Sequence, residues 1–435
     1  MPLLGHTLEL VRRPLEFMKS LAVQGDLIRI RFGPGTAVVV SEPGLLDKLL
    51  RDDRIFDKGG PFFDRARDVV GDSLPVCPHN VHRRLRRLAQ PSFHKTRLPG
   101  YADIMTSQIT AAVDRWHDGQ VLDVLEQTTT IASNTLVATM FSESLPAIVL
   151  QRMLEDLSTI VNGIYQRVII PPQLARLNLL GSWRYERASR RLRADMSTII
   201  AARRADGADH GDLLSALLHA DDPDSDHPRL SDDEIIGQLL SFFWAGTETT
   251  GSTVAWALHM LAQYPEIEDR LHAEVDAVLG GRVASYADLE QLELTSRIIT
   301  ETMRLWPSAW LLTRTATADT ELGGHAIAAG TTIVFGAYPI HHRADQLRAD
   351  RFDPDRWLPG KESPQRIAYV PFGAGARKCM GDVFSQTEAT LMLATIAARW
   401  SLSHLPGSRV RPKATAILSP AGLRMRATGR TVEER

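Results

Sequence analysis

The chain has 435 residues and a net charge of −2, so no excess of either sign points to nucleic acid or to an acidic membrane surface. Its two cysteines, Cys77 and Cys379, are too few for a disulfide framework and fit a reducing cytosol. The N-terminus lacks the apolar core of a signal peptide, and no apolar run reaches the ~20 residues of a membrane span, so we expect a cytoplasmic protein without a membrane anchor.

The predicted elements begin with a β-hairpin at 27–40, where two strand-like runs flank a Gly-Pro-Gly turn. A basic helix is expected at 81–93, ended by a proline. Long segments with a 3.6-residue period follow over 101–218, with breaks near 169–173 and 204–212. The first half of the chain is therefore expected to be mostly helical after its initial hairpin.

An acidic, proline-rich loop at 220–228 precedes a capping box formed by Ser231 and Glu234. A long apolar helix is expected to follow, from about 232 to 262. The remaining predicted elements are helices at 266–279 and 293–305, strands at 310–318 and 331–335, and a last long helix at 382–399. With no repeats and no flexible linker, residues 1–435 are predicted to form a single, mainly α-helical domain with a minor β part.

One cysteine, Cys379, lies in the glycine-rich stretch PFGAGARKCMGD at 371–382. Cations and helix N-termini favour a thiolate, and here Arg377 and Lys378 precede the thiol while a predicted helix follows it. The glycines allow tight turns and close approach of the backbone to a flat or bulky group. From these residues alone, a buried structural cysteine and a Cys–His nucleophile both remain open, whereas a zinc site lacks nearby ligands.

The spacing around this cysteine is more specific than the cysteine itself. Phe372-x-x-Gly375-x-Arg377-x-Cys379-x-Gly381 fixes five positions, and a chain of this length would match by chance roughly once in ten thousand. The chain resembles the cytochrome P-450 family over nearly its whole length, and this pattern is similar to that family's haem-binding loop. The resemblance implies a triangular helical prism with small β-sheets, with haem b buried between the long central helix and the cysteine loop. It also implies that the Cys379 thiolate is the axial ligand of the iron and that Phe372 packs beneath the macrocycle.

Two further segments resemble the family's in the expected order. Glu301 and Arg304 form its Glu-x-x-Arg pattern, and because positions i and i+3 share a helix face, the two charges can pair. Residues 352–357 resemble its Phe-x-Pro-x-Arg segment and supply Arg356. The resemblance implies a buried Glu–Arg–Arg cluster with a structural role, which holds the cysteine loop against the core. Taken separately, the pair is common on solvated helices, and the proline segment would pass as an exposed turn.

The long predicted helix contains the sequence AGTETT at 245–250. Gly and Thr are poor residues for a helix interior, costing up to ~1 kcal/mol each relative to Ala, so their clustering indicates a local distortion with a use. The stretch resembles the family's Ala-Gly-x-(Asp/Glu)-Thr-Thr, which implies that Ala245 contacts the haem, that the Thr249 hydroxyl assists O2 activation and that Glu248 delivers protons through water. The alternative is that Thr249 only donates to the carbonyl four residues earlier.

Four basic side chains are candidates for binding the two haem propionates. His82 and Arg86 stand at i and i+4 of the basic helix and share a face, which fits the family's His-x-x-x-Arg. The resemblance adds Arg314 and Arg377, and the planar fork of arginine suits a carboxylate. The other arginines of the basic helix are expected in solvent, where some would meet an acidic electron donor; they are Arg83, Arg84 and Arg87.

The leading hypothesis is a haem-thiolate monooxygenase that uses O2 and two electrons to oxidise an apolar small molecule. The resemblance implies separate electron partners, a ferredoxin and an NAD(P)H-dependent ferredoxin reductase, and we expect a monomer. A peroxide-driven or isomerising enzyme and a gas or redox sensor are less favoured, because this chain has the acid–alcohol pair Glu248 and Thr249. A non-haem cysteine hydrolase would leave the Glu–Arg–Arg cluster without explanation.

The predicted substrate pocket is mainly apolar. Its candidate residues are Gln238 and Phe242 on the long helix and Trp310 and Leu311 after the Glu-x-x-Arg helix, with the loops at 60–76 and 160–180 closing over the ligand. An apolar, compact ligand is favoured. The sequence also looks like bacterial terpene-pathway oxygenases, which implies a cyclic sesquiterpene from a secondary-metabolite or antibiotic pathway. A fatty acid, a polyketide or a steroid is the alternative.

Overall fold

The computed structural model describes residues 5–32, 35–142, 146–169, 182–223, 225–343, 350–361 and 368–430. Much of the predicted break at 169–173 and of the predicted substrate loop at 160–180 lies outside these ranges. Within them the chain is mainly helical with small β-sheets, which confirms the predicted class. No helix in these ranges is both long enough and apolar enough to cross a membrane.

The helices occupy most of the described chain. In chain order they are α1 Thr7–Arg12, α2 Pro14–Gln24, α3 Pro43–Arg51, α4 Pro61–Val70, α5 His79–Ala89, α6 Leu98–Val113, α7 Val124–Phe141, α8 Ala147–Ile169, α10 Ser182–Asp206, α11 Leu213–Leu218, α12 Asp232–Leu261, α13 Pro265–Leu279, α14 Glu293–Leu305, α15 Ala337–His341 and α16 Asp382–Arg399. The predicted basic helix is α5; it ends at Ala89, and Pro91 lies in the 3-10 turn Gln90–Phe93 that follows.

The strands are short and form several small sheets. In chain order they are β1 Leu27–Phe32, β2 Gly35–Val40, β3 Phe56–Asp57, β4 Val121–Asp123, β5 Leu312–Ala316, β6 Thr320–Leu322, β7 His325–Ile327, β8 Thr332–Phe335, β9 Trp400–His404, β10 Arg411–Ala414, β11 Leu418–Ala421 and β12 Arg424–Gly429. The largest sheet has the order β1-β2-β8-β5-β3 and contains the predicted hairpin, with Leu27 opposite Val40. The remaining sheets are β4-β12-β9, β10-β11 and β6-β7.

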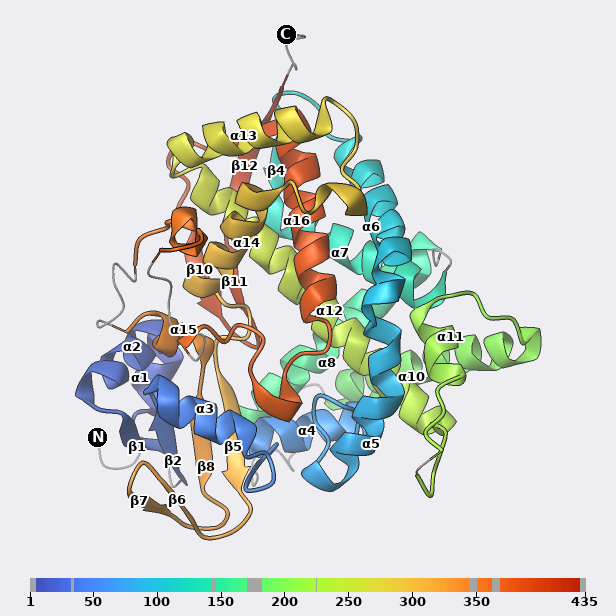
Figure 1. Cartoon of the computed structure of the whole chain (residues 1–435). Helices are drawn as coiled ribbons and strands as arrows, with labels where there is room; N and C mark the ends of the chain where they lie inside the picture. The colour runs from blue at the N-terminus through green and yellow to red at the C-terminus, as the bar shows by residue number, and fades with distance from the viewer. Residues whose placement is uncertain are drawn as a thin grey trace.

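Helix α12 runs through the middle of the molecule (Figure 1) and begins at the predicted capping box. The Glu234 N–H donates to Ser231 Oγ at 3.2 Å, and the Ser231 N–H donates to Glu234 Oε2 at 2.8 Å. Its 30 residues span ~45 Å at the usual helical rise. Helix α7 packs closely on it because Gly251 has no side chain, and a Cβ there would lie 2.6 Å from Thr129 Cα. α12 is therefore the element around which the rest is arranged.

Two helices, α16 and α14, pack against α12, and α5 lies near the cysteine loop. α16 starts directly after the cysteine loop and packs against α12 with a largely buried surface. α14 lies beside both, and Trp306, just after its end, stacks on Trp256 of α12 with ring centroids 4.1 Å apart. α5 lies near the start of α16 (Figure 1), so the basic helix and the cysteine loop are neighbours.

Candidate active site

The cysteine loop is held by its own backbone and by helix α3. The Cys379 N–H donates to the Phe372 carbonyl at 2.9 Å, which closes the loop on itself. Gly375 has a positive φ of 67°, and a Cβ there would lie 2.4 Å from the Leu50 carbonyl oxygen. A residue with a side chain at 375 would therefore push the loop off α3, which explains the glycine at this position of the pattern.

The Cys379 side chain is accessible, yet the surrounding protein is dense enough for burial to raise the pKa of its thiol. The Gly381 N–H acts in the opposite direction, because it stabilises the thiolate. Within the described ranges no histidine hydrogen-bonds to this sulfur, and no group of three or more metal-ligating side chains is assembled. The site therefore lacks both the base of a Cys–His hydrolase and the ligands of a zinc site.

The structure brings the predicted Glu–Arg–Arg cluster together and buries it. Arg304 donates to both carboxylate oxygens of Glu301, Nε to Oε2 and Nη2 to Oε1, each at 2.8 Å. Arg356 Nε adds a longer contact to Oε1 at 3.4 Å. Two groups that the sequence did not indicate also donate to this carboxylate: Trp357 Nε1 and the Asp353 N–H, both at 3.0 Å. The buried Glu301 carboxylate is thus satisfied from α14 and from the 352–357 segment.

A buried histidine connects this cluster to the cysteine loop. The Val370 N–H donates to His341 Nε2 at 3.0 Å, so Nδ1 carries the proton and donates to the Arg304 carbonyl at 2.9 Å. Burial lowers the pKa of His341 to about 3, which keeps the ring neutral and this pattern intact. Val370 stands two residues before Phe372. The sequence reasoning missed His341, because a single histidine in a short helix has no spacing signal.

In α12 the Thr249 hydroxyl donates to the Ala245 carbonyl at 2.7 Å, as the alternative reading expected. Its lone pairs remain able to accept a hydrogen bond. The Thr249 carbonyl accepts from two hydroxyls, Thr253 Oγ1 and Ser308 Oγ, each at 3.0 Å. The helix is continuous through this turn, so the predicted local distortion stays a prediction.

Glu248, the neighbouring acid, is half-buried, and burial raises the pKa of its carboxyl. Lys413 of β10 is the charged side chain that opposes this shift. A raised pKa brings a carboxyl group closer to the range in which general acids exchange protons with water. The group therefore has the chemistry required of a proton donor.

Arg377, predicted to bind a propionate, is committed to protein groups in this structure. Its Nε donates to Asp53 Oδ2 at 2.7 Å and its Nη2 to Asp57 Oδ1 at 2.8 Å. Nη1 donates to the Cys77 carbonyl at 2.8 Å. The Arg377 side chain is 1% exposed, and all three of its guanidinium nitrogens donate to protein groups.

Two other cations lie near Arg377 and form no ion pair with a carboxylate in the described part of the chain. Arg314 is 2% exposed, and its Nε and Nη1 have no hydrogen-bond partner in the part of the chain that the structure describes. Burial, followed by the charge of Arg377, lowers the pKa of Arg314 to about 10. Burial likewise lowers the pKa of Lys58 well below its usual range, with Arg314 the next cause, and its amine lies over the Phe63 ring at 4.9 Å. The buried Arg314 and the half-buried Lys58 make no ion pair with any described residue, and the two propionates of a haem would neutralise them.

The remaining predicted cations lie on α5. His82 is buried, and burial lowers its pKa to about 4, so it is neutral at physiological pH. Arg86 reaches the cysteine loop, with Nη1 donating to the Lys378 carbonyl at 2.6 Å. Of the arginines expected in solvent, Arg84 pairs with Glu234 and Arg87 with Asp222; Arg83 is exposed. Haem therefore fits this donor set through Cys379, Arg314 and Lys58, and Lys58 was not predicted.

The candidate pocket residues fall into two groups. Phe242 packs edge-on against Phe93, with ring centroids 5.2 Å apart, and Gln238 accepts from the Leu74 N–H at 3.2 Å while its buried Nε2 has no partner among the described residues. Trp310 is 5% exposed and donates to the Thr415 carbonyl, as part of the core under the largest sheet. Leu311 is partly buried in the same cluster. All three of Gln238, Phe242 and Trp310 are buried, and their role in a substrate pocket stays a prediction.

Comparisons with known proteins place these observations in a wider context. The family model described as Cytochrome P450 matches residues 1–425. Pentalenene oxygenase of Streptomyces avermitilis is 43% identical over 433 residues, covering 99% of this chain and 96% of that protein. Cyclooctat-9-en-7-ol 5-monooxygenase of Streptomyces melanosporofaciens is 42% identical, covering 94% and 89%. The crystal structure of the haem domain of cytochrome P450DA superposes with a TM-score of 0.88 at 27% identity, covering 97% of this chain and 94% of that one.

Proposed function

Because the chain belongs to the cytochrome P450 family, we propose that it is the oxygenase of a cyclic terpene. Members of this family bind haem through a cysteine thiolate, and the chain is accordingly a P450 monooxygenase. The observation that carries the substrate proposal is the 43% identity to a pentalenene oxygenase across 99% of the chain. A second relative, at 42% identity, is named for the oxidation of cyclooctat-9-en-7-ol.

Haem supplies O2 activation by two electrons when it is bound, and the chain supplies the groups that hold it. We assign Cys379 as its thiolate ligand and Arg314 and Lys58 as the cations for its propionates. The support is that the buried Arg314 and the half-buried Lys58 lie close to each other and form no ion pair with a described residue. Arg377 then acts indirectly: fixed by Asp53 and Asp57, it ties the cysteine loop to the segment that carries Lys58.

Proton delivery is assigned to Glu248 and Thr249. The Thr249 hydroxyl, oriented by its bond to the Ala245 carbonyl, accepts a hydrogen bond from water and positions a proton at the reaction site. Glu248 replaces that proton from the water on its other side, and burial raises its pKa toward the range where it can do so. The two side chains are adjacent on one turn, so a short water path between them suffices.

Electrons are assigned to a separate ferredoxin, reduced by an NAD(P)H-dependent reductase. The support is the basic face of α5, which adjoins the cysteine loop through the Arg86 contact to the Lys378 carbonyl. Arg83 on that helix is exposed and makes no ion pair with any described residue, so it is available to an acidic partner. Arg83→Glu should raise the KM for ferredoxin and leave substrate affinity unchanged.

The substrate proposal is tested by binding and turnover on the haem-loaded enzyme. Pentalenene, cyclooctat-9-en-7-ol, lauric acid and testosterone are titrated while the spin-state change of the haem spectrum is followed. Each is then incubated with NADPH, a surrogate ferredoxin and its reductase, and products are examined by mass spectrometry. We expect a saturable spectral change and a product with one added oxygen atom for a cyclic terpene. Tighter binding and faster turnover of the fatty acid or the steroid would refute the assignment.

A further inference from the structure

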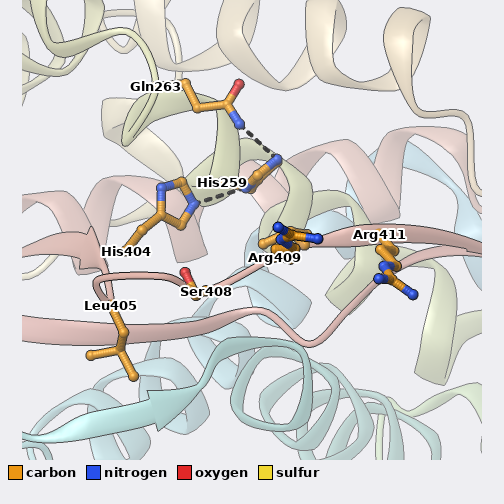
Figure 2. Close-up of a pocket in the computed structure, with 8 residues that line it drawn as sticks. His259, Gln263, His404, Leu405, Ser408, Arg409 and Arg411 are labelled. Carbon is orange, nitrogen blue, oxygen red and sulfur yellow. Dashed lines mark hydrogen bonds between the residues drawn. The ribbon is translucent and has the colours of Figure 1, made fainter.

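A second cavity lies away from the cysteine loop, at the carboxyl end of α12 (Figure 2). Its volume is about 530 Å³, and it is lined by His259 and Gln263 from that end of the helix and by residues from 404–411, between β9 and β10. A turn at Gly407, with φ of 74°, folds this segment back, and the Ser408 N–H donates to the Leu405 carbonyl at 3.0 Å. None of the residues assigned to the haem site lines this cavity.

Two histidines form one wall of the cavity and are fixed by a glutamine. Gln263 Nε2 donates to His259 Nε2 at 3.0 Å, so His259 carries its proton on Nδ1 and donates to His404 Nε2 at 2.9 Å. Burial lowers the pKa of His259 to about 4 and also lowers the pKa of His404. Both rings are therefore neutral at physiological pH, and the two nitrogens that face each other are already engaged. The pair thus forms a polar, uncharged wall and is not available as a pair of metal ligands.

Two arginines provide the charge of the cavity. Arg409 and Arg411 are two residues apart, a spacing that places side chains on the same side of an extended segment, and both line the cavity (Figure 2). Both are exposed, and neither guanidinium makes a hydrogen bond or ion pair with any residue that the structure describes. Arginines in nearby segments behave differently: Arg430 pairs with Asp276 at 2.7 Å, and Arg399 pairs with Asp114. No acidic residue lines the cavity, so its two positive charges have no counter-charge.

We propose that this cavity binds a phosphoryl group, either as free phosphate or diphosphate or as the anionic end of a small organic phosphate. Two guanidinium forks and the Ser408 hydroxyl offer more donors than the two oxygens of a single carboxylate can accept, whereas a phosphate has at least three acceptor oxygens. A metal cation is disfavoured by the adjacent positive charges of Arg409 and Arg411. The cavity is far larger than one phosphate ion, and Leu405 and Val410 give it an apolar wall that an organic group can contact.

The test is calorimetric titration of the haem-loaded enzyme with inorganic phosphate, inorganic diphosphate and glycerol 3-phosphate, with ionic strength held constant by sodium chloride. Arg409→Gln/Arg411→Gln is compared with wild type and with Arg424→Gln. Arg424 is an exposed arginine on β12 that does not line the cavity. We expect saturable binding of at least one probe to wild type and to Arg424→Gln, and roughly tenfold or greater weakening in the double variant, since each charged hydrogen bond contributes about 1.5–3 kcal/mol.

The three probes distinguish the sources of the phosphoryl group. If glycerol 3-phosphate binds more tightly than phosphate, the site is assigned to an organic phosphate. If diphosphate binds more tightly than phosphate, the site is assigned to free diphosphate. An unchanged haem absorption spectrum and melting temperature in the double variant would show that the loss is local. Arg409→Lys/Arg411→Lys should bind at an intermediate level, because it keeps the charges and loses the planar forks. Absence of saturable heat with every probe, or equal affinity in wild type and the double variant, would overturn the proposal.

Discussion

Arg377 Nε lies 2.7 Å from Asp53 Oδ2, so the arginine of the cysteine loop is neutralised by a residue that precedes it by 324 positions. Asp57 takes the same guanidinium from the other side at 2.8 Å. Asp53 and Asp57 also influence the adjacent Arg314, and Asp57 influences Lys58, but neither cation forms an ion pair with a described residue. This arrangement supports our proposal that Lys58, which is half-buried, binds the propionate for which Arg377 was predicted.

The first prediction concerns Lys58. Lys58→Met keeps much of the side-chain volume and removes the charge, so haem should be lost roughly tenfold faster or more, as expected when a charged hydrogen bond worth about 1.5–3 kcal/mol is deleted. The measurement is the rate of haem transfer to apomyoglobin. Arg83→Met, an exposed cation on α5, is the matched control and should release haem at the wild-type rate. If Lys58→Met and wild type lost haem at equal rates, Lys58 would not bind a propionate, and Arg377 would again be the candidate.

Local signals in the sequence were sufficient to predict many of the helices. The capping box at Ser231 and Glu234 predicts a helix from 232 to about 262, and α12 spans Asp232–Leu261. The signal is reliable because all the groups involved are within one turn. The strands after residue 399 were missed, since β12 pairs with β4 and the partners, such as Arg424 and Asp123, are 301 residues apart. Strands this short have no periodicity that a sequence can reveal.

Residues of the site that belong to a local sequence pattern were also predicted, whereas residues defined by distant contacts were not. Cys379, Glu301 and Arg304 were found because each lies in a short pattern with fixed spacing. Lys58 and His341 were not, because their roles come from groups that approach them only in the folded chain. No spacing rule relates a lysine near position 58 to an arginine at 314.

The two cysteines should differ in a carbon monoxide difference spectrum of the reduced protein. Cys379→Ala should abolish the spectrum of a thiolate-ligated haem, because it removes the proposed ligand. Cys77→Ala should retain it, since Cys77 is buried and donates only to the Leu74 carbonyl at 3.5 Å, and burial raises its pKa to about 11. A thiolate spectrum in Cys379→Ala would contradict the assignment.

Glu301→Gln should yield little folded holoprotein. The substitution removes the buried carboxylate charge that both Arg304 and Arg356 contact, and breaking a buried ion pair costs roughly 3–5 kcal/mol. Haem content per polypeptide and the melting temperature provide the measurement. Glu293→Gln, on the same helix but with a side chain 75% exposed, is the control and should behave as wild type. Normal haem content in Glu301→Gln would rule out the structural role.

His341 should make the stability depend on pH. Burial lowers the pKa of His341 to about 3, whereas an unfolded histidine titrates near 6.5. The unfolded chain therefore binds more protons between these values, and the free energy of unfolding should fall as the pH drops from about 6.5 toward 3. His341→Gln should be less stable at pH 7, because it disturbs the bonds to Arg304 and Val370, but should lose less further stability between pH 7 and pH 5. His117→Gln, an exposed control, should keep the wild-type melting temperature at both pH values; identical pH profiles for His341→Gln and wild type would disprove the assignment.

Thr249→Ala should separate electron consumption from product formation. The fold should survive, because alanine is the better helix former and the only hydroxyl bond lost is the one to the Ala245 carbonyl. Haem and substrate binding should also persist, and NADPH oxidation should continue, since electron transfer does not require this hydroxyl. Without a positioned proton, less of the O2 consumed should reach the substrate and more should leave as hydrogen peroxide.

Two ratios measure the effect of Thr249→Ala: oxidised terpene formed per NADPH consumed, and hydrogen peroxide formed per NADPH consumed. Thr247→Ala is the matched control, because Thr247 lies two residues away on α12, is buried, and its hydroxyl has no hydrogen-bond partner among the described residues. It should keep the wild-type ratios. If Thr249→Ala also kept those ratios, the proton would have to come from another group, and because burial raises the pKa of Glu248, Glu248→Gln would become the decisive variant. If only Glu248→Gln lowered the ratio of product to NADPH consumed, proton delivery would depend on Glu248 and not on the Thr249 hydroxyl.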